Sequence, residues 1–169
     1  MGLNTASLIV WLHVFAGIIW IGLLYYFNFV QVPAVAAAAS DSNGPGPAAI
    51  SKYVAPRALW WFRWGALATW LTGAAALSQP HVGGFVPNMF FTNGLTEIGI
   101  GAWLGTIMLF NVWGLIWPNQ KKLLGLKEAT DAEKATAKKV AFMASRTNTL
   151  LSIPMIMCMV AVGHGGFPF

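Results

Sequence analysis

Four long apolar segments constrain this chain more than any other feature of its sequence. A helix that crosses the hydrocarbon core of a bilayer needs about 20 residues. The apolar segments are that long, and they cover roughly residues 6–32, 57–78, 98–117 and 146–163. Only 9% of the 169 residues are charged, against about a quarter in soluble domains. We therefore expect one domain over residues 1–169, an all-α integral membrane four-helix bundle.

The expected helix ends follow from local signals. Pro33 follows the first apolar segment, and we expect that helix to stop there because proline cannot continue the hydrogen-bond ladder. The fourth segment is preceded by a polar helical pattern over about residues 130–145. Thr130 and Glu133 have the spacing of a capping box at its start. We expect this extension to be cytoplasmic and continuous with the last helix.

The basic residues are distributed unevenly along the chain. The net charge is +5, and six of the ten basic residues lie between Lys121 and Lys139, whereas none lies between Arg63 and Lys121. Neither terminus carries a Lys or Arg, and neither does the connection over residues 79–97. The positive-inside rule then puts the two basic loops in the cytoplasm and both termini on the outer side. This asymmetry indicates a lipid bilayer as the partner, and not nucleic acid.

Polar and small residues mark the faces that pack inside the bundle. His, Asn and Gln are costly against lipid, so the stripe that contains them on the first helix should face inward. Its members recur every three or four residues: His13, Gly17, Trp20, Leu24, Asn28 and Gln31. Gly65, Thr69 and Gly73, and also Gly101 and Gly105, have the spacing that lets helices approach closely. The alternative use of these glycines is a flat cofactor lying against them.

The three histidines are the best candidates for a cofactor site. With the topology above, His13, His81 and His164 all lie toward the outer side. Imidazole is a common ligand of metals and of haem iron. His13 is the strongest candidate because it alone lies inside a helix, and His81 and His164 are rivals for a second ligand.

Other residues near that depth extend the predicted site. Gly17, one turn from His13, leaves room for a porphyrin edge, and Trp20 lies on the same stripe. We therefore predict haem b bound by His13, His164 or His81, with Gly17 and Trp20 beside it. Met159 is a weaker alternative iron ligand.

A second polar group gathers toward the inner side. Side-chain amides there either hydrogen-bond the helices together or form a site for an anion or a quinone headgroup beside Arg63. The residues concerned are Asn28, Gln31, Arg63, Asn111, Arg146 and Asn148.

Several kinds of chemistry are excluded. Cys158 is the single cysteine, so the chain has no internal disulfide and no C-x-x-C-H sequence for covalent haem. No P-loop, Rossmann turn or nucleophile elbow is present.

Three strings resemble the bacterial membrane-bound urate hydroxylase family. They are W-L-H-V-F-A-G-I-I-W-I-G-L-L-Y-Y-F-N-F-V-Q-V-P at 11–33, N-V-W-G-L-I-W-P-N-Q-K-K at 111–122 and S-R-T-N-T-L-L-S-I-P-M at 145–155. A first-helix His followed by W-x-G is more distantly similar to four-helix membrane haem proteins of the HemJ and CopD type. The resemblance implies a multi-pass protein of the bacterial inner membrane. Family members carry a periplasmic cytochrome c domain that the sequence up to Phe169 lacks, so a separate cytochrome c or respiratory complex would accept electrons.

Two functions from different classes remain open. The first is a haem-b membrane redox protein, an oxidoreductase of the urate hydroxylase type or an electron-transfer module. The second is a non-catalytic accessory or assembly subunit of a larger respiratory membrane complex. Such a subunit would dock through its aromatic faces and the outer loop over residues 82–95. Bound haem favours the first, and co-purification with a complex without a cofactor favours the second.

Overall fold

The computed structural model describes residues 4–92, 94 and 96–167, and these form helices and turns with no strand. The expectation of an all-α chain is confirmed for this part. The first long rod consists of α1 (Thr5–Tyr25), η1 (Tyr26–Gln31) and α2 (Val32–Ser40), and α3 (Ala55–Leu77) follows η2 (Ile50–Val54). The remaining elements are η3 (Pro80–Val82), α4 (Phe85–Met89), α5 (Thr96–Phe110), η4 (Asn111–Ile116), α6 (Trp117–Leu123) and α7 (Asp131–Gly163).

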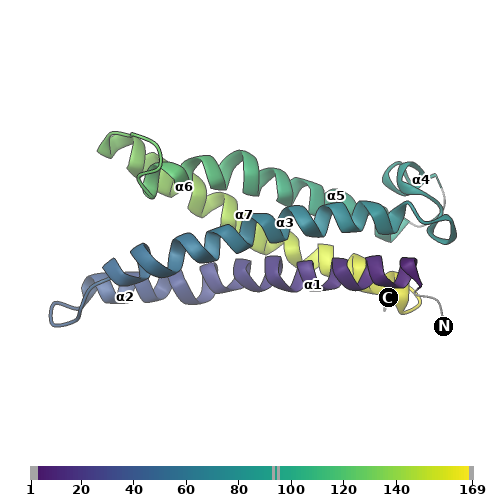
Figure 1. Ribbon diagram of the computed structural model, residues 1–169, viewed down its shortest axis with the longest axis horizontal. Coiled ribbons are helices and arrows are strands. Elements are labelled where there is room, and N and C mark those ends of the chain that lie inside the picture. Colours follow the sequence, from purple (N-terminus) through teal and green to yellow (C-terminus); the bar gives the residue numbers. More distant parts are fainter. Residues whose placement is uncertain (1–3, 93, 95, 168–169) are drawn as a thin grey trace.

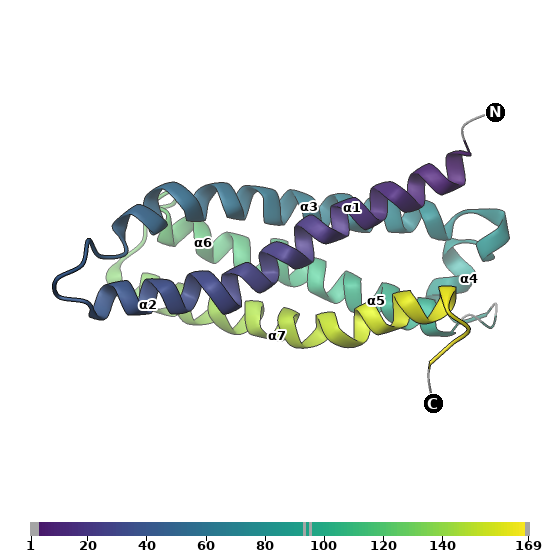
Figure 2. The same ribbon diagram turned by 90° about the horizontal axis from the view of Figure 1, so that it is seen from below.

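The rods pack as two helical hairpins. The most extensive contacts join α1 to α3 and α5 to α7, and fewer contacts link one hairpin to the other. All the rods run roughly along one long axis (Figure 1). The first turn of α1 and the last turn of α7 lie at the same end as α4, on opposite sides of the molecule (Figure 2). A core of buried residues joins the hairpins near the middle, and it includes Trp20, Leu24, Phe62, Met108 and Val112.

The expected end of the first helix at Pro33 is wrong. The helix continues through Pro33 to Ser40 because a π-helical turn, η1, precedes the proline. The N–H of Val32 donates to the carbonyl of Phe27, five residues back. This wider turn relieves the clash that a proline ring makes with the carbonyl four residues earlier in an α-helix. Residues 34–40, which follow the proline, are therefore helical.

The start of α7 follows the sequence signal. The Thr130 side chain accepts from the backbone N–H of Glu133, and the Glu133 carboxylate accepts from the backbone N–H of Thr130. The capping box is confirmed, and the extension is continuous with the last helix.

Two rods, Thr5–Ser40 and Thr96–Leu123, are long and apolar enough to cross a membrane. The sequence had indicated four such segments. The other two rods are less apolar, because α3 carries Arg57 and Arg63 and α7 begins with charged turns.

Candidate functional site

His13 lies in the first half of α1, with its imidazole against α3. Its Nδ1–H donates a hydrogen bond of 2.8 Å to the backbone carbonyl of Thr69. A carbonyl oxygen only accepts, so the ring hydrogen is on Nδ1, and in the neutral ring Nε2 keeps the lone pair. Nε2 makes no hydrogen bond in the described part of the chain, and it is not one of the enclosed polar atoms there. The ring is therefore held in the tautomer that ligates through Nε2.

Small residues on α3 make this close packing possible. A methyl group at Gly73 would lie 2.8 Å from Cε1 of His13, and one at Gly65 would lie 3.4 Å from a backbone nitrogen of α1. Gly17 faces Thr69, whose Cγ2 would be 3.8 Å from a methyl group at Gly17. The helix-packing interpretation of the small-residue pattern on α3 is thus confirmed.

The other two histidines lie at the same end of the molecule but on different elements. His81 is exposed on η3 and borders a shallow open pocket with the first turns of α1, including Trp11. His164 is exposed at the end of α7, where its Nδ1–H donates to the Val160 carbonyl at 2.9 Å. In the neutral ring its Nε2 therefore keeps the lone pair, as in His13. Within the described residues, no group of three or more His, Cys, Asp or Glu side chains could hold a metal ion.

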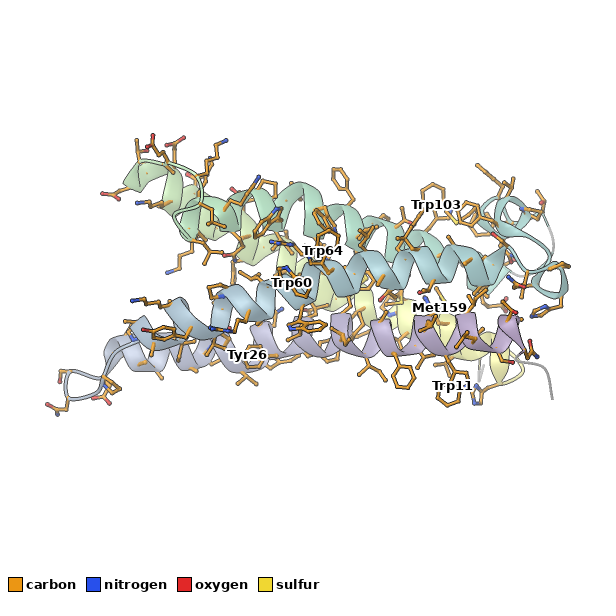
Figure 3. The ribbon with its side chains drawn as sticks, in the orientation of Figure 1. Trp11, Tyr26, Trp60, Trp64, Trp103 and Met159 are labelled. Carbon is orange, nitrogen blue, oxygen red and sulfur yellow. The ribbon has the colours of Figure 1, made fainter. Side chains whose placement is uncertain are left out.

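Trp20 and Met159 lie deeper in the bundle. Trp20 is 2% exposed, and its Nε1 is enclosed without a hydrogen-bond partner among the described residues. The Met159 side chain packs against α5, with its sulfur 3.4 Å from where a methyl group at Gly101 would lie. In Figure 3, Met159 lies toward the same end of the long axis as Trp11 and Trp103.

The inner polar residues form a buried network centred on α7. The Asn28 side chain donates to Ser145 Oγ at 2.8 Å. Asn111 donates to the Asn148 side chain at 2.8 Å, and Asn148 donates to the carbonyl of Met108 at 2.9 Å. Asn28, Asn111 and Asn148 are all buried. These bonds join α7 to η1, η4 and α5, so the interpretation that amides hold the helices together is confirmed for them.

The two inner arginines do not take part in this network. The Arg63 guanidinium stacks on the Trp117 ring, 3.7 Å from its centroid, and its Nε is enclosed without a partner. Arg146 lies over Phe142 at 5.1 Å. Neither arginine forms an ion pair with a carboxylate among the described residues.

The second half of the chain matches a known protein family. The sequence profile of the urate oxidase N-terminal family matches residues 81–168. The chain belongs to this family. No curated protein matches the chain, and no solved structure matches it.

The match to the urate oxidase N-terminal family covers α4 to α7, and so it includes His81, His164 and the Asn111–Asn148 pair. Two of the three strings that carried the resemblance lie inside it. α1 and His13 lie outside it, so the role of His13 rests on its geometry.

Sequence reasoning missed three partners within this member of the urate oxidase N-terminal family. They are the Thr69 carbonyl for His13, Ser145 for Asn28, and Trp117 for Arg63. A backbone carbonyl carries no sequence signal. Ser145 and Trp117 lie on the expected inner side, but only the rotation of each helix about its axis decides which side chains meet.

Proposed function

We propose that this member of the urate oxidase N-terminal family is an integral membrane protein with four spans. The two most apolar rods support this, because only 17% and 28% of their central windows are buried, whereas the core helix of a soluble protein is mostly buried. Trp11, Phe15 and Ile18 are each more than half exposed. A contiguous apolar surface of this kind is suited to lipid and not to water. The rods of α3 and α7 run beside the other two and complete the bundle.

The ends of the bundle support an orientation with both termini outside. The basic loops, around Lys52 and from Lys121 onward, lie at the end opposite the first turn of α1 and the last turn of α7 (Figure 1). Aromatic side chains also separate along the axis. Trp11 and Trp103 lie toward the terminal end, whereas Trp60 and Trp64 lie about midway along the long axis (Figure 3). An inner excess of Lys and Arg is typical of a multi-pass protein of the bacterial inner membrane.

For the function itself, we propose a haem-b redox protein that passes electrons from a urate-oxidising reaction to a separate cytochrome or respiratory complex. The observation that carries this proposal is the His13 imidazole. Its Nδ1–H is occupied by the Thr69 carbonyl, and Nε2 is left open. A histidine that binds a metal usually donates its other ring N–H to a carbonyl or carboxylate in this way. The residues present fit a haem better than a metal held by protein side chains alone, because no group of three or more His, Cys, Asp or Glu lies together among the described residues. A porphyrin would provide most of the iron ligands, and the protein would need to provide only one or two.

The remaining residues of the site hold and shape this group. His13 would supply one nitrogen ligand to the iron, and His164 or His81, which lie at the same end, would supply a second. Gly73 leaves room for the His13 ring to pack against α3. The exposed apolar residues in the outer half of α1 would keep water away from the bound haem. Haem, when bound, provides a one-electron iron couple. The family membership supports urate as the reductant.

The experiment is an optical spectrum of the detergent-purified chain, oxidised and then reduced with dithionite. We expect a b-type band that sharpens on reduction and a haem-to-protein ratio that falls to near zero in His13→Ala. His81→Ala and His164→Ala are compared in parallel. The variant of these two that changes the spectrum identifies the second ligand, and the other serves as the matched control for loss of an exposed histidine.

The outcomes separate the two functions. A haem-free but folded wild-type chain contradicts the redox proposal and favours the accessory subunit, which is then sought by co-purification. Haem that persists in His13→Ala contradicts the assignment of the ligand. If the band behaves as expected, urate oxidation is assayed with an added electron acceptor.

A further inference from the structure

We propose that Arg63, Trp117 and Lys121 bind the phosphate of an anionic phospholipid at the cytoplasmic end of the bundle. The inference rests on the membrane orientation proposed above and is independent of haem. Arg63 Cζ lies 3.7 Å from the centroid of the Trp117 ring, and Lys121 Nζ lies 5.9 Å from the same centroid. One indole ring thus gathers two positive charges, one from α3 and one from α6.

No carboxylate in the described part of the chain pairs with Arg63 or Lys121. The described residues contain ion pairs between Lys122 and Glu133 and between Lys134 and Asp131, and neither involves Arg63 or Lys121. An arginine that is half-buried near the membrane interface without a carboxylate is costly unless an anion joins it. The planar guanidinium is suited to bidentate binding of a phosphate.

Enclosed hydrogen-bond donors indicate that an acceptor is missing. Nε of Arg63 and Nε1 of Trp113 are both enclosed, and neither has a partner in the described part of the chain. Trp113 lies about one turn before Trp117 and contacts Trp64, the neighbour of Arg63, with ring centroids 5.3 Å apart. Phosphate oxygens supply several acceptors at once, which a neutral ligand of similar size does not.

The surroundings favour a lipid as the source of the phosphate. Trp60, Trp61 and Trp64 flank Arg63 on α3, and each is between 43% and 54% exposed. Exposed indoles of this kind lie at the headgroup level of a bilayer. Basic pockets between helices on the cytoplasmic side are known to take the headgroups of anionic lipids. The half-buried guanidinium of Arg63 therefore lies among residues that suit the level of phospholipid phosphates.

The test measures the thermal midpoint of the full chain in neutral detergent during titration with phosphatidylglycerol, phosphatidylcholine or inorganic phosphate. We expect a saturable rise with phosphatidylglycerol only. In Arg63→Gln, the lipid fraction for half-maximal effect should increase roughly tenfold or more, the value of one charged hydrogen bond. Arg57→Gln is the matched control, because Arg57 is exposed on the same helix and already donates to the Tyr53 carbonyl.

Each outcome decides the proposal. An unchanged response in Arg63→Gln, or an equal response to phosphatidylcholine, overturns it. Saturation by inorganic phosphate alone indicates a free-anion site and overturns the lipid assignment. If Arg63→Gln does not fold, the same titration is made with Lys121→Gln, and the lipid fraction for the half-maximal effect should again increase. The haem spectrum is recorded on the same samples, so loss of either property is seen separately.

Discussion

At the scale of single residues, His13 has a structural role, and the proposed function adds a chemical one. Its Nδ1–H closes the contact between α1 and α3, and the same bond leaves the Nε2 lone pair free for the proposed ligand. The role therefore depends on the backbone of α3 as well as on the histidine. A backbone carbonyl cannot be removed by substitution. The role of the His13 ring is therefore tested at Gly73, which packs against it.

Replacement of Gly73 by alanine should displace the His13 ring. The added methyl group would lie 2.8 Å from Cε1, and both the helix pair and the imidazole would have to shift. We expect haem content to fall several-fold in Gly73→Ala. Gly105→Ala is the control, because nothing lies within 4 Å of its added methyl group, and the better helix propensity should stabilise it by up to about 1 kcal/mol. Equal haem content in both variants would show that haem binding does not depend on the packing of the His13 ring against Gly73.

The buried amide pair of Asn111 and Asn148 should be important for stability. Asn148→Ala removes the acceptor for the Asn111 side chain and the donor to the Met108 carbonyl. A buried donor left without a partner costs about 1–3 kcal/mol. We expect the free energy of unfolding, measured in detergent, to fall by about this amount in Asn148→Ala. In Asn119→Ala, which removes a solvent-exposed hydrogen bond to the Leu115 carbonyl of the same rod, the loss should be far smaller.

At the scale of elements, three prolines are each preceded by a π-helical turn. η1 ends two residues before Pro33, η2 two residues before Pro56, and η4 two residues before Pro118. In each case the N–H of the residue just before the proline donates to a carbonyl five residues back. The wider turn lets each rod continue past its proline. It also turns Asn28 and Asn111, which lie in η1 and η4, toward α7.

The capping box at the start of α7 should weaken in acid. The hydrogen bond from the Thr130 backbone N–H holds the pKa of Glu133 below its ordinary value of 4.5. A carboxyl group with a lowered folded-state pKa stabilises the helix above that ordinary value, and the contribution is lost as the pH falls through the folded-state pKa. We expect amide exchange in the first turn of α7, corrected for intrinsic rates, to be slow at pH 7 and faster near pH 3. Thr130→Ala should cost about 1 kcal/mol of local stability at pH 7 but should keep much of the pH dependence, because the backbone N–H of residue 130 still donates to Glu133. Glu133→Gln cannot titrate and should remove the pH dependence; an unchanged pH profile in Glu133→Gln would contradict this origin.

At the scale of the whole molecule, the arrangement of the rods determines which loops share a side of the membrane. The two hairpins place the loop after α3 at the same end as the first turn of α1, and the loops after α2 and α6 at the other end (Figures 1 and 2). If only the two most apolar rods crossed the bilayer, the loop after α3 would instead lie on the cytoplasmic side.

Cysteine labelling tests this topology directly. The native Cys158 is buried, so background labelling should be low. A membrane-impermeant maleimide should label Ser78→Cys in intact spheroplasts, and it should label Ser42→Cys and Glu128→Cys only after permeabilisation. All three positions are exposed. Protection of Ser78→Cys in intact cells would mean that the chain has two spans and not four.

The sequence alone determined the features that depend on local composition. These are the helical class, the approximate position of each rod, the charge asymmetry, and the capping box, whose partners are only three residues apart. The predicted end of the first helix at Pro33 was wrong, because whether a proline ends a helix or widens one turn depends on how the rest of the rod packs. The tertiary structure decided which side chains meet. His13 and Thr69 are 56 residues apart and Asn111 and Asn148 are 37 apart, and such contacts depend on the rotation and depth of each helix, which packing sets and composition does not.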